Sequence, residues 1–191
     1  PLSLVPDVNL NSVFCLPNSE CWAVGDPSSG ELILRNSSGA TWNRQTAIAG
    51  IPDVILHSVF CLTTSDCWAV GNVSGGEVII HWNGSAWSRV GPSAAPDVNL
   101  NSIFCIVAND CWAAGASGTI IHWNGKSRSH SIETGGEICN DIYFFTATNG
   151  FVAGSNGQIR RWNGVAWSTI YTTGTQIWQE VQAISNGDGL V

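Results

Sequence analysis

The sequence predicts an all-β fold made of repeated antiparallel units, on two observations. First, short runs rich in β-branched and aromatic residues alternate with Gly, Asn and Ser turn residues, and none of the 191 residues lies in a stretch with helical periodicity. Second, the same runs return in the same order at intervals of about 40 to 50 residues, which is typical of repeat architectures.

Three motifs mark each repeat. NSVFC or a variant of it occupies residues 11–15, 57–61, 101–105 and 140–144. CWAVG or a variant follows at 21–25, 67–71, 111–115 and 150–154. IHWNG or a variant comes third, at 80–84, 121–125 and 160–164, with a divergent first copy at 34–39. A tryptophan closes three repeats, at Trp42, Trp87 and Trp167, whereas residues 126–129 of the third repeat read KSRS.

Four short strands in a repeat of this length are typical of a β-propeller blade. Runs such as VFCL and CWAV are continuously apolar, as expected of a sheet that neighbouring blades cover on both faces. The Asn-Gly pairs in the third motif favour a tight turn before the fourth strand. We therefore expect a β-propeller of four-stranded antiparallel blades at 11–56, 57–100, 101–139 and 140–178, after a lead-in strand or linker at 1–10.

The two ends of the chain also align with the repeat. Residues 179–191 match residues 140–152, and residues 1–10 match residues 91–100. The sequence thus predicts the start of a fifth blade at 179–191 and a ring that this chain alone does not close. Either the chain is an excerpt of a longer propeller, or strands of another copy close it, or its open edges join copies into a filament. We favour the excerpt.

The stretch HWNGSAW at 81–87 resembles the Asp-box, or sialidase-type BNR repeat, and also the repeats of photosystem II assembly factor propellers. Asn83, Asn124 and Asn163 stand where that family has Asp, and His81, His122 and Arg161 stand where it has Ser or Thr. The resemblance implies the propeller architecture. In that family the box stabilises a turn remote from any active site, so the resemblance implies no chemistry.

Six of the seven cysteines form three pairs at one spacing: Cys15 and Cys21, Cys61 and Cys67, Cys105 and Cys111. The fourth repeat has Phe144 and Gly150 at these places, and joint loss is what bonded pairs predict. Facing positions on antiparallel strands suit a disulfide, whereas five intervening residues exceed the usual spacing of zinc ligands. We expect three disulfides, an oxidising compartment and an extracellular or cell-surface location. Cys139 is left over, either free or bonded to a segment or chain outside this sequence.

The amino-acid composition argues against two classes of partner. A net charge of −7, with only seven lysines and arginines, argues against nucleic acid and anionic membrane surfaces. No segment approaches the roughly 20 apolar residues of a membrane span, so we expect no membrane insertion. The sequons at Asn36, Asn72 and Asn83 agree with a glycosylated outer surface.

Acidic side chains recur once per blade, in two sets. One set is Glu20, Asp66, Asp110 and Asp188, with Asn149 in the fourth copy; the other is Asp7, Asp53 and Asp97. A ring of carboxylates could hold calcium or a cationic partner. The alternative, which we favour, is that these side chains cap tight loops.

Basic and aromatic side chains recur in the third motif. His81, His122, Arg35 and Arg161 share one blade position, as a ligand rim or, as we favour, as partners of the following turn or a neighbouring blade. Most tryptophans occupy repeated strand positions, which predicts core packing. Trp82, Trp123 and Trp162, next to the Asn-Gly turn, are the candidates for an exposed platform on which a glycan could stack.

Catalytic motifs are missing from the sequence. It contains no nucleophile elbow, phosphate loop or His-Glu-x-x-His motif, and its two tyrosines and repeat-bound arginines do not match a sialidase-type site. The repeat is broken at residues 126–137, where an added site would be expected. The sequence therefore predicts a non-catalytic binding or scaffolding module with a protein or glycan partner. A filament subunit, self-associating through open blade edges, and a lectin-like or glycoside-acting propeller are the alternatives.

Overall fold

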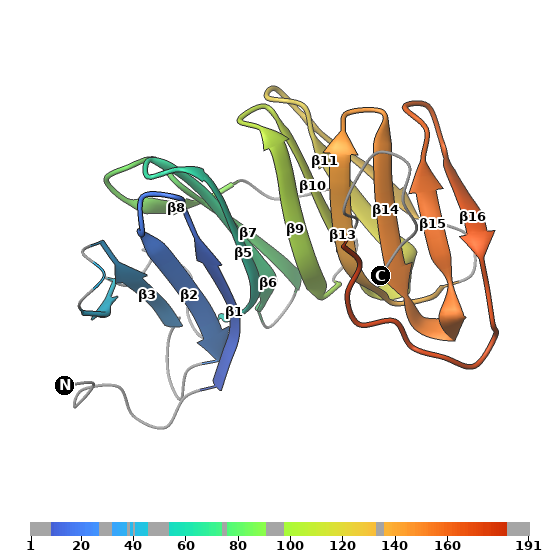
Figure 1. Ribbon diagram of the computed structural model, residues 1–191, viewed down its shortest axis with the longest axis horizontal. Coiled ribbons are helices and arrows are strands. Elements are labelled where there is room, and N and C mark those ends of the chain that lie inside the picture. The colour runs from blue at the N-terminus through green and yellow to red at the C-terminus, as the bar shows by residue number, and fades with distance from the viewer. Residues whose placement is uncertain are drawn as a thin grey trace. The chain divides into compact units, whose positions relative to one another are not determined.

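The computed structural model of the chain describes residues 9–26, 32–37, 39, 41–45, 54–73, 76–90, 98–132 and 136–182. The regular structure in these ranges is almost all β, in four separate four-stranded sheets (Figure 1). Each sheet is antiparallel, and its strands are hydrogen-bonded in chain order. The fold is therefore all-β, as the repeat predicts.

Strand bounds are as follows. The first sheet consists of β1 (Asn9–Cys15), β2 (Cys21–Asp26), β3 (Leu32–Asn36) and β4 (Asn43–Arg44). The second consists of β5 (Ile55–Thr63), β6 (Asp66–Val73), β7 (Gly76–Trp82) and β8 (Trp87–Arg89). The third consists of β9 (Leu100–Val107), β10 (Asp110–Gly115), β11 (Thr119–Trp123) and β12 (Arg128–Ile132). The fourth consists of β13 (Cys139–Thr146), β14 (Asn149–Gly154), β15 (Ile159–Trp162) and β16 (Trp167–Tyr171). Two single 3-10 turns, η1 (Ala116–Gly118) and η2 (Ser155–Gly157), join the second and third strands of the last two sheets.

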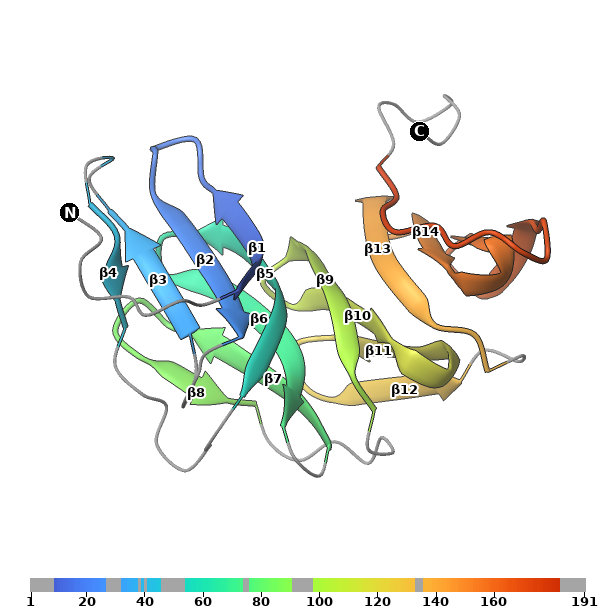
Figure 2. The ribbon, with the colours of Figure 1, turned by 90° about the horizontal axis from the view of Figure 1, so that it is seen from below.

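The chain forms two compact units, residues 1–99 and residues 100–191. In the first unit, the sheet β1–β4 packs against the sheet β5–β8 (Figure 2). Trp22, Val24 and Ile33 of the first sheet contact a buried cluster on the second that includes Ile80 and Trp87. Burying large apolar side chains between two sheets is the main source of stability in such a unit.

The second unit repeats this packing. Trp112 and Ile120 of the third sheet contact Ile142, Phe144 and Val152 of the fourth. This arrangement explains half of each continuous apolar run, since alternate residues of a strand share one face of the sheet and this face meets the other sheet of the unit.

A β-bulge in the first strand of the first sheet, and another in the first strand of the third sheet, link each of these sheets to the other sheet of its unit. The register shifts at Asn11 in β1 and at Asn101 in β9, which leaves these side chains pointing out of the ladder. Asn11 Nδ2 donates to the carbonyl of Leu56 at 2.9 Å, and Asn101 Nδ2 donates to the carbonyl of Cys139 at 3.0 Å. These amides therefore fix the register between neighbouring sheets.

The segment after β16 contacts β13 in the same way. Asn140 Nδ2 donates to the carbonyl of Trp178 at 2.7 Å. Val181 N donates to Asp141 Oδ2 at 2.8 Å, just as Ile142 N donates to Ser102 Oγ at 3.4 Å. Residues 178–181 thus lie beside β13 as residues 139–142 lie beside β9. Residues 183–191 lie outside the described part of the chain.

Three disulfides close the loops between the first and second strands, Cys15–Cys21, Cys61–Cys67 and Cys105–Cys111. Each joins directly opposite residues of an antiparallel pair, with Cα atoms 4.1, 4.0 and 4.0 Å apart. In the fourth sheet the ring of Phe144 lies where a Cβ of Gly150 would be, so the aromatic ring takes the place of the bond. Cys139 is buried and is part of none of these three disulfides. The disulfides indicate an oxidising compartment.

Asp141 makes the stability of the second unit depend on pH. Burial raises the pKa of its carboxyl above the usual 3.8, against the opposing hydrogen bonds from Ser102, Val181 and Ile142. A folded-state pKa above the unfolded value means that the native state binds the proton more tightly, so ionisation of Asp141 lowers the stability as pH rises through its folded pKa. We expect the wild type to gain stability relative to Asp141→Asn as pH falls from about 7 to about 4. Urea unfolding of both proteins across this range checks the sign, and a relative loss for the wild type would contradict it.

Within the described residues, no helix is long and apolar enough to cross a membrane.

Candidate functional site

One polar group recurs in each sheet, at the start of the second strand. Asp66 Oδ1 accepts hydrogen bonds from Trp68 Nε1 at 3.0 Å and from His81 Nε2 at 2.8 Å. In the third sheet Asp110 Oδ1 accepts from Trp112 Nε1 at 2.9 Å and lies 2.8 Å from His122 Nε2. The acid therefore ties its own strand to the neighbouring third strand.

In the first and fourth sheets other residue types form this group. Glu20 accepts from Trp22 Nε1 at 3.0 Å and from both Nε and Nη2 of Arg35 at 3.1 Å. In the fourth sheet Asn149 Oδ1 accepts from Arg161 Nε at 3.0 Å, and Phe151 replaces the tryptophan. The sequence predicted bonds from the basic side chains to the following turn or a neighbouring blade, but these hydrogen bonds go to the residue at the start of the second strand of the same sheet. The strand register explains this, because it places each basic side chain opposite the aromatic residue two positions further along that strand. Arg35 also contacts the neighbouring sheet, where its guanidinium lies 5.4 Å from the ring centre of Trp82.

Among the residues that the structure describes, no group of three or more His, Cys, Asp or Glu side chains could hold a metal ion. Glu20, Asp66 and Asp110 are instead hydrogen-bonded within their sheets. Asp7, Asp53, Asp97 and Asp188, which complete the two predicted sets, lie outside the described residues.

Asp110→Ala tests this recurring group. We expect it to lower the free energy of unfolding by about 1–3 kcal/mol, because the indole N–H of Trp112 and the ring of His122 both lose their acceptor. Asp110→Asn keeps one acceptor oxygen and should cost less. Urea unfolding of the two variants measures the difference, and an Asp110→Ala variant as stable as the wild type would show that the group contributes nothing.

The predicted tryptophan platform is only partly exposed. Trp82 is wrong as a platform residue, because it is 5% exposed and its ring packs 5.1 Å from that of Trp22 in the core. Trp123 and Trp162 are half-buried. Trp162 Nε1 donates to the carbonyl of Ala147 at 3.0 Å, which holds the ring against the neighbouring loop.

The three sequons differ in accessibility. Asn36 is only 8% exposed and its Oδ1 accepts from the backbone of Gly39, so a glycan on this side chain would displace buried structure and the prediction is wrong there. Asn72 is half-buried and contacts His57 at 2.7 Å. Asn83 is exposed at the tip of the turn between β7 and β8. Asn83 is the sequon whose position suits a glycan.

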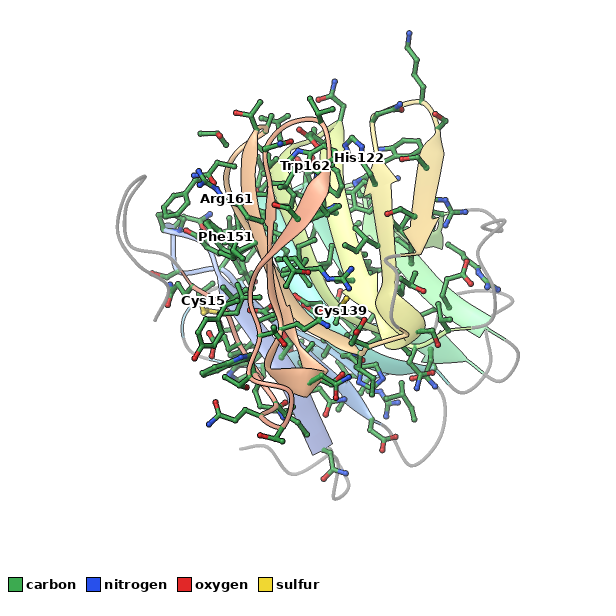
Figure 3. The ribbon with its side chains drawn as sticks, turned by 90° about the vertical axis from the view of Figure 1, so that its right-hand side faces the viewer. Cys15, His122, Cys139, Phe151, Arg161 and Trp162 are labelled. Atoms are coloured by element: carbon green, nitrogen blue, oxygen red, sulfur yellow. A yellow bond between two sulfur atoms is a disulfide. The ribbon has the colours of Figure 1, made fainter. Side chains whose placement is uncertain are left out.

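A hollow in the second unit lies between strands β10–β12 of the third sheet and strands β15 and β16 of the fourth. It is a cavity of about 420 Å³. Its floor and walls are made by Trp112, Ile120, His122, Ser129, Ser131, Trp162, Val165, Ala166 and Trp167. Figure 3 shows His122 and Trp162 near each other at one end of this unit, with Cys139 toward the other end.

The sequence anticipated part of this cavity. His122 and Trp162 are candidate ligand residues, and the structure brings them together. Ser129 and Ser131 lie within residues 126–137, where the repeat is broken and the sequence predicts an added site. The sequence did not single out these two serines within that segment. Trp167 is one of the tryptophans at repeated positions for which the sequence predicts core packing. Its ring is half-buried, packs against the core cluster of the second unit and also lines the cavity.

Repeated four-stranded antiparallel sheets with these interfaces define a β-propeller fold. No family model matches the chain, and no curated protein matches it. Solved propeller structures do. A structure of YCF48 bound to D1 peptide matches with a TM-score of 0.66 at 16% identity, over 86% of this chain and 55% of that one. YCF48 from Cyanidioschyzon merolae matches with a TM-score of 0.65 at 16% identity, over 95% and 63%. The WD40 propeller domain of Doa1 matches with a TM-score of 0.67 at 14% identity, over 95% and 60%.

These likenesses establish the fold alone. The chain spans 55%, 63% and 60% of the lengths of these three structures. The resemblance to photosystem II assembly factor propellers is thus matched in the fold by YCF48, while no sequence family supports the Asp-box assignment.

Proposed function

We propose that this chain is a non-catalytic binding or scaffolding module with a protein partner, acting at an extracellular or cell-surface site. The observation that carries the proposal is the cavity of about 420 Å³ in the second unit, which is lined by aromatic rings and two serine hydroxyls. Concave sites of this size, mainly apolar with a few polar groups, are typical of ligand recognition.

The recurring polar side chains have a structural role in the sheets. His81 and His122, the imidazoles of the repeat, are each bonded to an aspartate and packed on a tryptophan ring. The recurrence of these pairs is explained by this strand-joining role, which each sheet needs once.

The comparison with YCF48 supports a polypeptide as the partner. That protein has been solved bound to D1 peptide, and its fold is similar to that of this chain. A propeller of this kind can therefore present a peptide site. Three disulfides support an oxidising environment, which fits partners outside the cytoplasm.

A displayed library of random peptides tests the proposal. We expect the intact chain to enrich a shared sequence pattern, and we expect Ser131→Trp, which fills the cavity, to weaken binding of the enriched peptides about tenfold or more. Ile170→Trp is the matched control, because Ile170 is 49% exposed on β16 and does not line the cavity. Failure to enrich any pattern, or full binding by Ser131→Trp, would overturn the proposal.

The alternative to a binding or scaffolding module is a filament subunit that self-associates through open blade edges. It depends mainly on residues 1–8 and 183–191, which lie outside the described part of the chain.

A further inference from the structure

The two units contain the same cluster of three tryptophans. In the first unit the rings of Trp22 and Trp82 are 5.1 Å apart at 56°, and Trp87 lies 5.3 Å from Trp22. In the second unit the rings of Trp112 and Trp162 are also 5.1 Å apart at 56°. Trp167 completes this second cluster, 6.0 Å from Trp112. The two clusters are therefore matched sites on one chain.

The first cluster is filled by a cation of the protein itself. The guanidinium carbon of Arg35 lies 5.0 Å from the ring centre of Trp22 and 5.4 Å from that of Trp82. The negative faces of tryptophan rings attract a cation at such distances. Arg35 also pairs with Glu20 at 3.0 Å, so its charge is neutralised.

The second cluster has smaller side chains at the corresponding places. His122 replaces Arg35, since each lies opposite the tryptophan of its second strand. Ser129, opposite His122, replaces Asn43, opposite Arg35. Ser131, opposite Ile120, replaces Gln45, whose N–H donates to the carbonyl of Ile33. These three changes all remove volume on the side where the cavity lies.

His122 uses one ring of the second cluster and leaves another available. It stacks on Trp112 at 3.9 Å and 12°, so that face is occupied. Trp162 and Trp167 line the cavity together with the hydroxyls of Ser129 and Ser131. Serine oxygens accept hydrogen bonds from a guanidinium, and the net charge of −7 favours a cationic partner.

We propose that this cavity is a subsite for an arginine side chain of the partner polypeptide, which takes the place that Arg35 fills in the first unit. This inference rests on the proposed function, because it names the side chain that the cavity receives. The planar guanidinium suits stacking on tryptophan better than an ammonium group does, so we expect preference for arginine over lysine.

Titration of the intact chain with N-acetyl-arginine methylamide tests the subsite directly. Indole N–H signals in a nitrogen-15 correlation spectrum report on the tryptophans of both units. We expect a saturable shift with a dissociation constant on the order of 1 mM, and about tenfold weaker binding of the citrulline analogue, which has the same shape without the charge. Equal binding of citrulline would overturn the proposal, as would no saturable shift.

Two variants copy the filled site of the first unit. His122→Arg places a guanidinium in the cavity beside Asp110, as Arg35 lies beside Glu20, and we expect it to weaken arginine binding about tenfold or more. Ser129→Asn with Ser131→Gln copies Asn43 and Gln45 and provides a second test should His122→Arg not fold. His81→Arg is the matched control, because His81 holds the same strand position in the second sheet, opposite Trp68, and does not line the cavity, so binding should be unchanged. Full binding by both filled variants would overturn the subsite.

Methyl glycosides form the third arm of the titration. If they bind and His122→Arg prevents this, while the arginine derivative does not bind, the cavity is a sugar site and the proposal is overturned. The outcome of the peptide library separates the two proposals. Enriched peptides without arginine would overturn the subsite and keep the protein-binding function. Arginine binding without any enriched peptide would keep the arginine site and overturn the protein-binding function.

Discussion

Phe144→Ala is expected to lower the free energy of unfolding by about 3–5 kcal/mol. The side chain is only 3% exposed, and its ring lies 4.9 Å from that of Trp112 and 5.9 Å from that of Trp167. Truncation would leave a cavity at the interface of the third and fourth sheets and would uncover the backbone at Gly150, which the ring covers. Urea unfolding followed by tryptophan fluorescence measures the loss.

Ile170→Ala is the control for this prediction, because Ile170 is 49% exposed on β16 in the same unit and should change the stability by no more than about 0.5 kcal/mol. A Phe144→Ala variant within about 1 kcal/mol of the wild type would contradict the role of this ring, because removing a buried aromatic ring from a packed interface costs more than that.

Removal of the Cys61–Cys67 disulfide by a double change to alanine is expected to lower the free energy of unfolding by about 2 kcal/mol from loop closure alone, with a further loss from packing. Both cysteines are buried, at 3% and 0% exposure, within the core of the first unit. The sulfur atoms therefore also fill space between the sheets. Calorimetric or urea unfolding of the double variant checks the total.

The Cys15–Cys21 bridge gives a matched comparison. It closes a loop of the same sequence separation, 6 residues, but Cys15 is exposed. Its removal should cost the loop-closure part without the packing part, again about 2 kcal/mol. If both double variants lost the same stability, the packing contribution of the buried bridge would be excluded.

Sequence patterns predicted the strands and the disulfides because both are local. Cys61 and Cys67 face each other across a short turn, so their spacing alone places them together. The Asn-Gly turns are also local, and Gly84, Gly125 and Gly164 have φ of 93°, 84° and 94° as such turns require.

The partners of the recurring bases could not be predicted in this way. His81 meets Asp66 from 15 residues away and His122 meets Asp110 from 12 residues away. These pairs are fixed by the register between the second and third strands, because a shift of one residue would turn each side chain to the opposite face. The length of the intervening turn varies, so the sequence alone leaves this register open.

Only some residues of the cavity were predicted from the sequence, for a related reason. His122 and Trp162 stood out by residue type, but Trp82, at the same place in its repeat as Trp162, packs in the core. The two sites differ in what fills them, since Arg35, Asn43 and Gln45 correspond to His122, Ser129 and Ser131. Only the strand register shows that these three positions share one face.

A crystal structure of the intact chain with the most strongly enriched peptide tests the binding function most directly. We predict that a peptide side chain occupies the cavity between Trp162 and the strand that carries Ser129 and Ser131, in contact with the Trp162 ring. A complex in which the peptide lies elsewhere and this cavity holds no part of it would contradict the central claim that the cavity is the site of recognition.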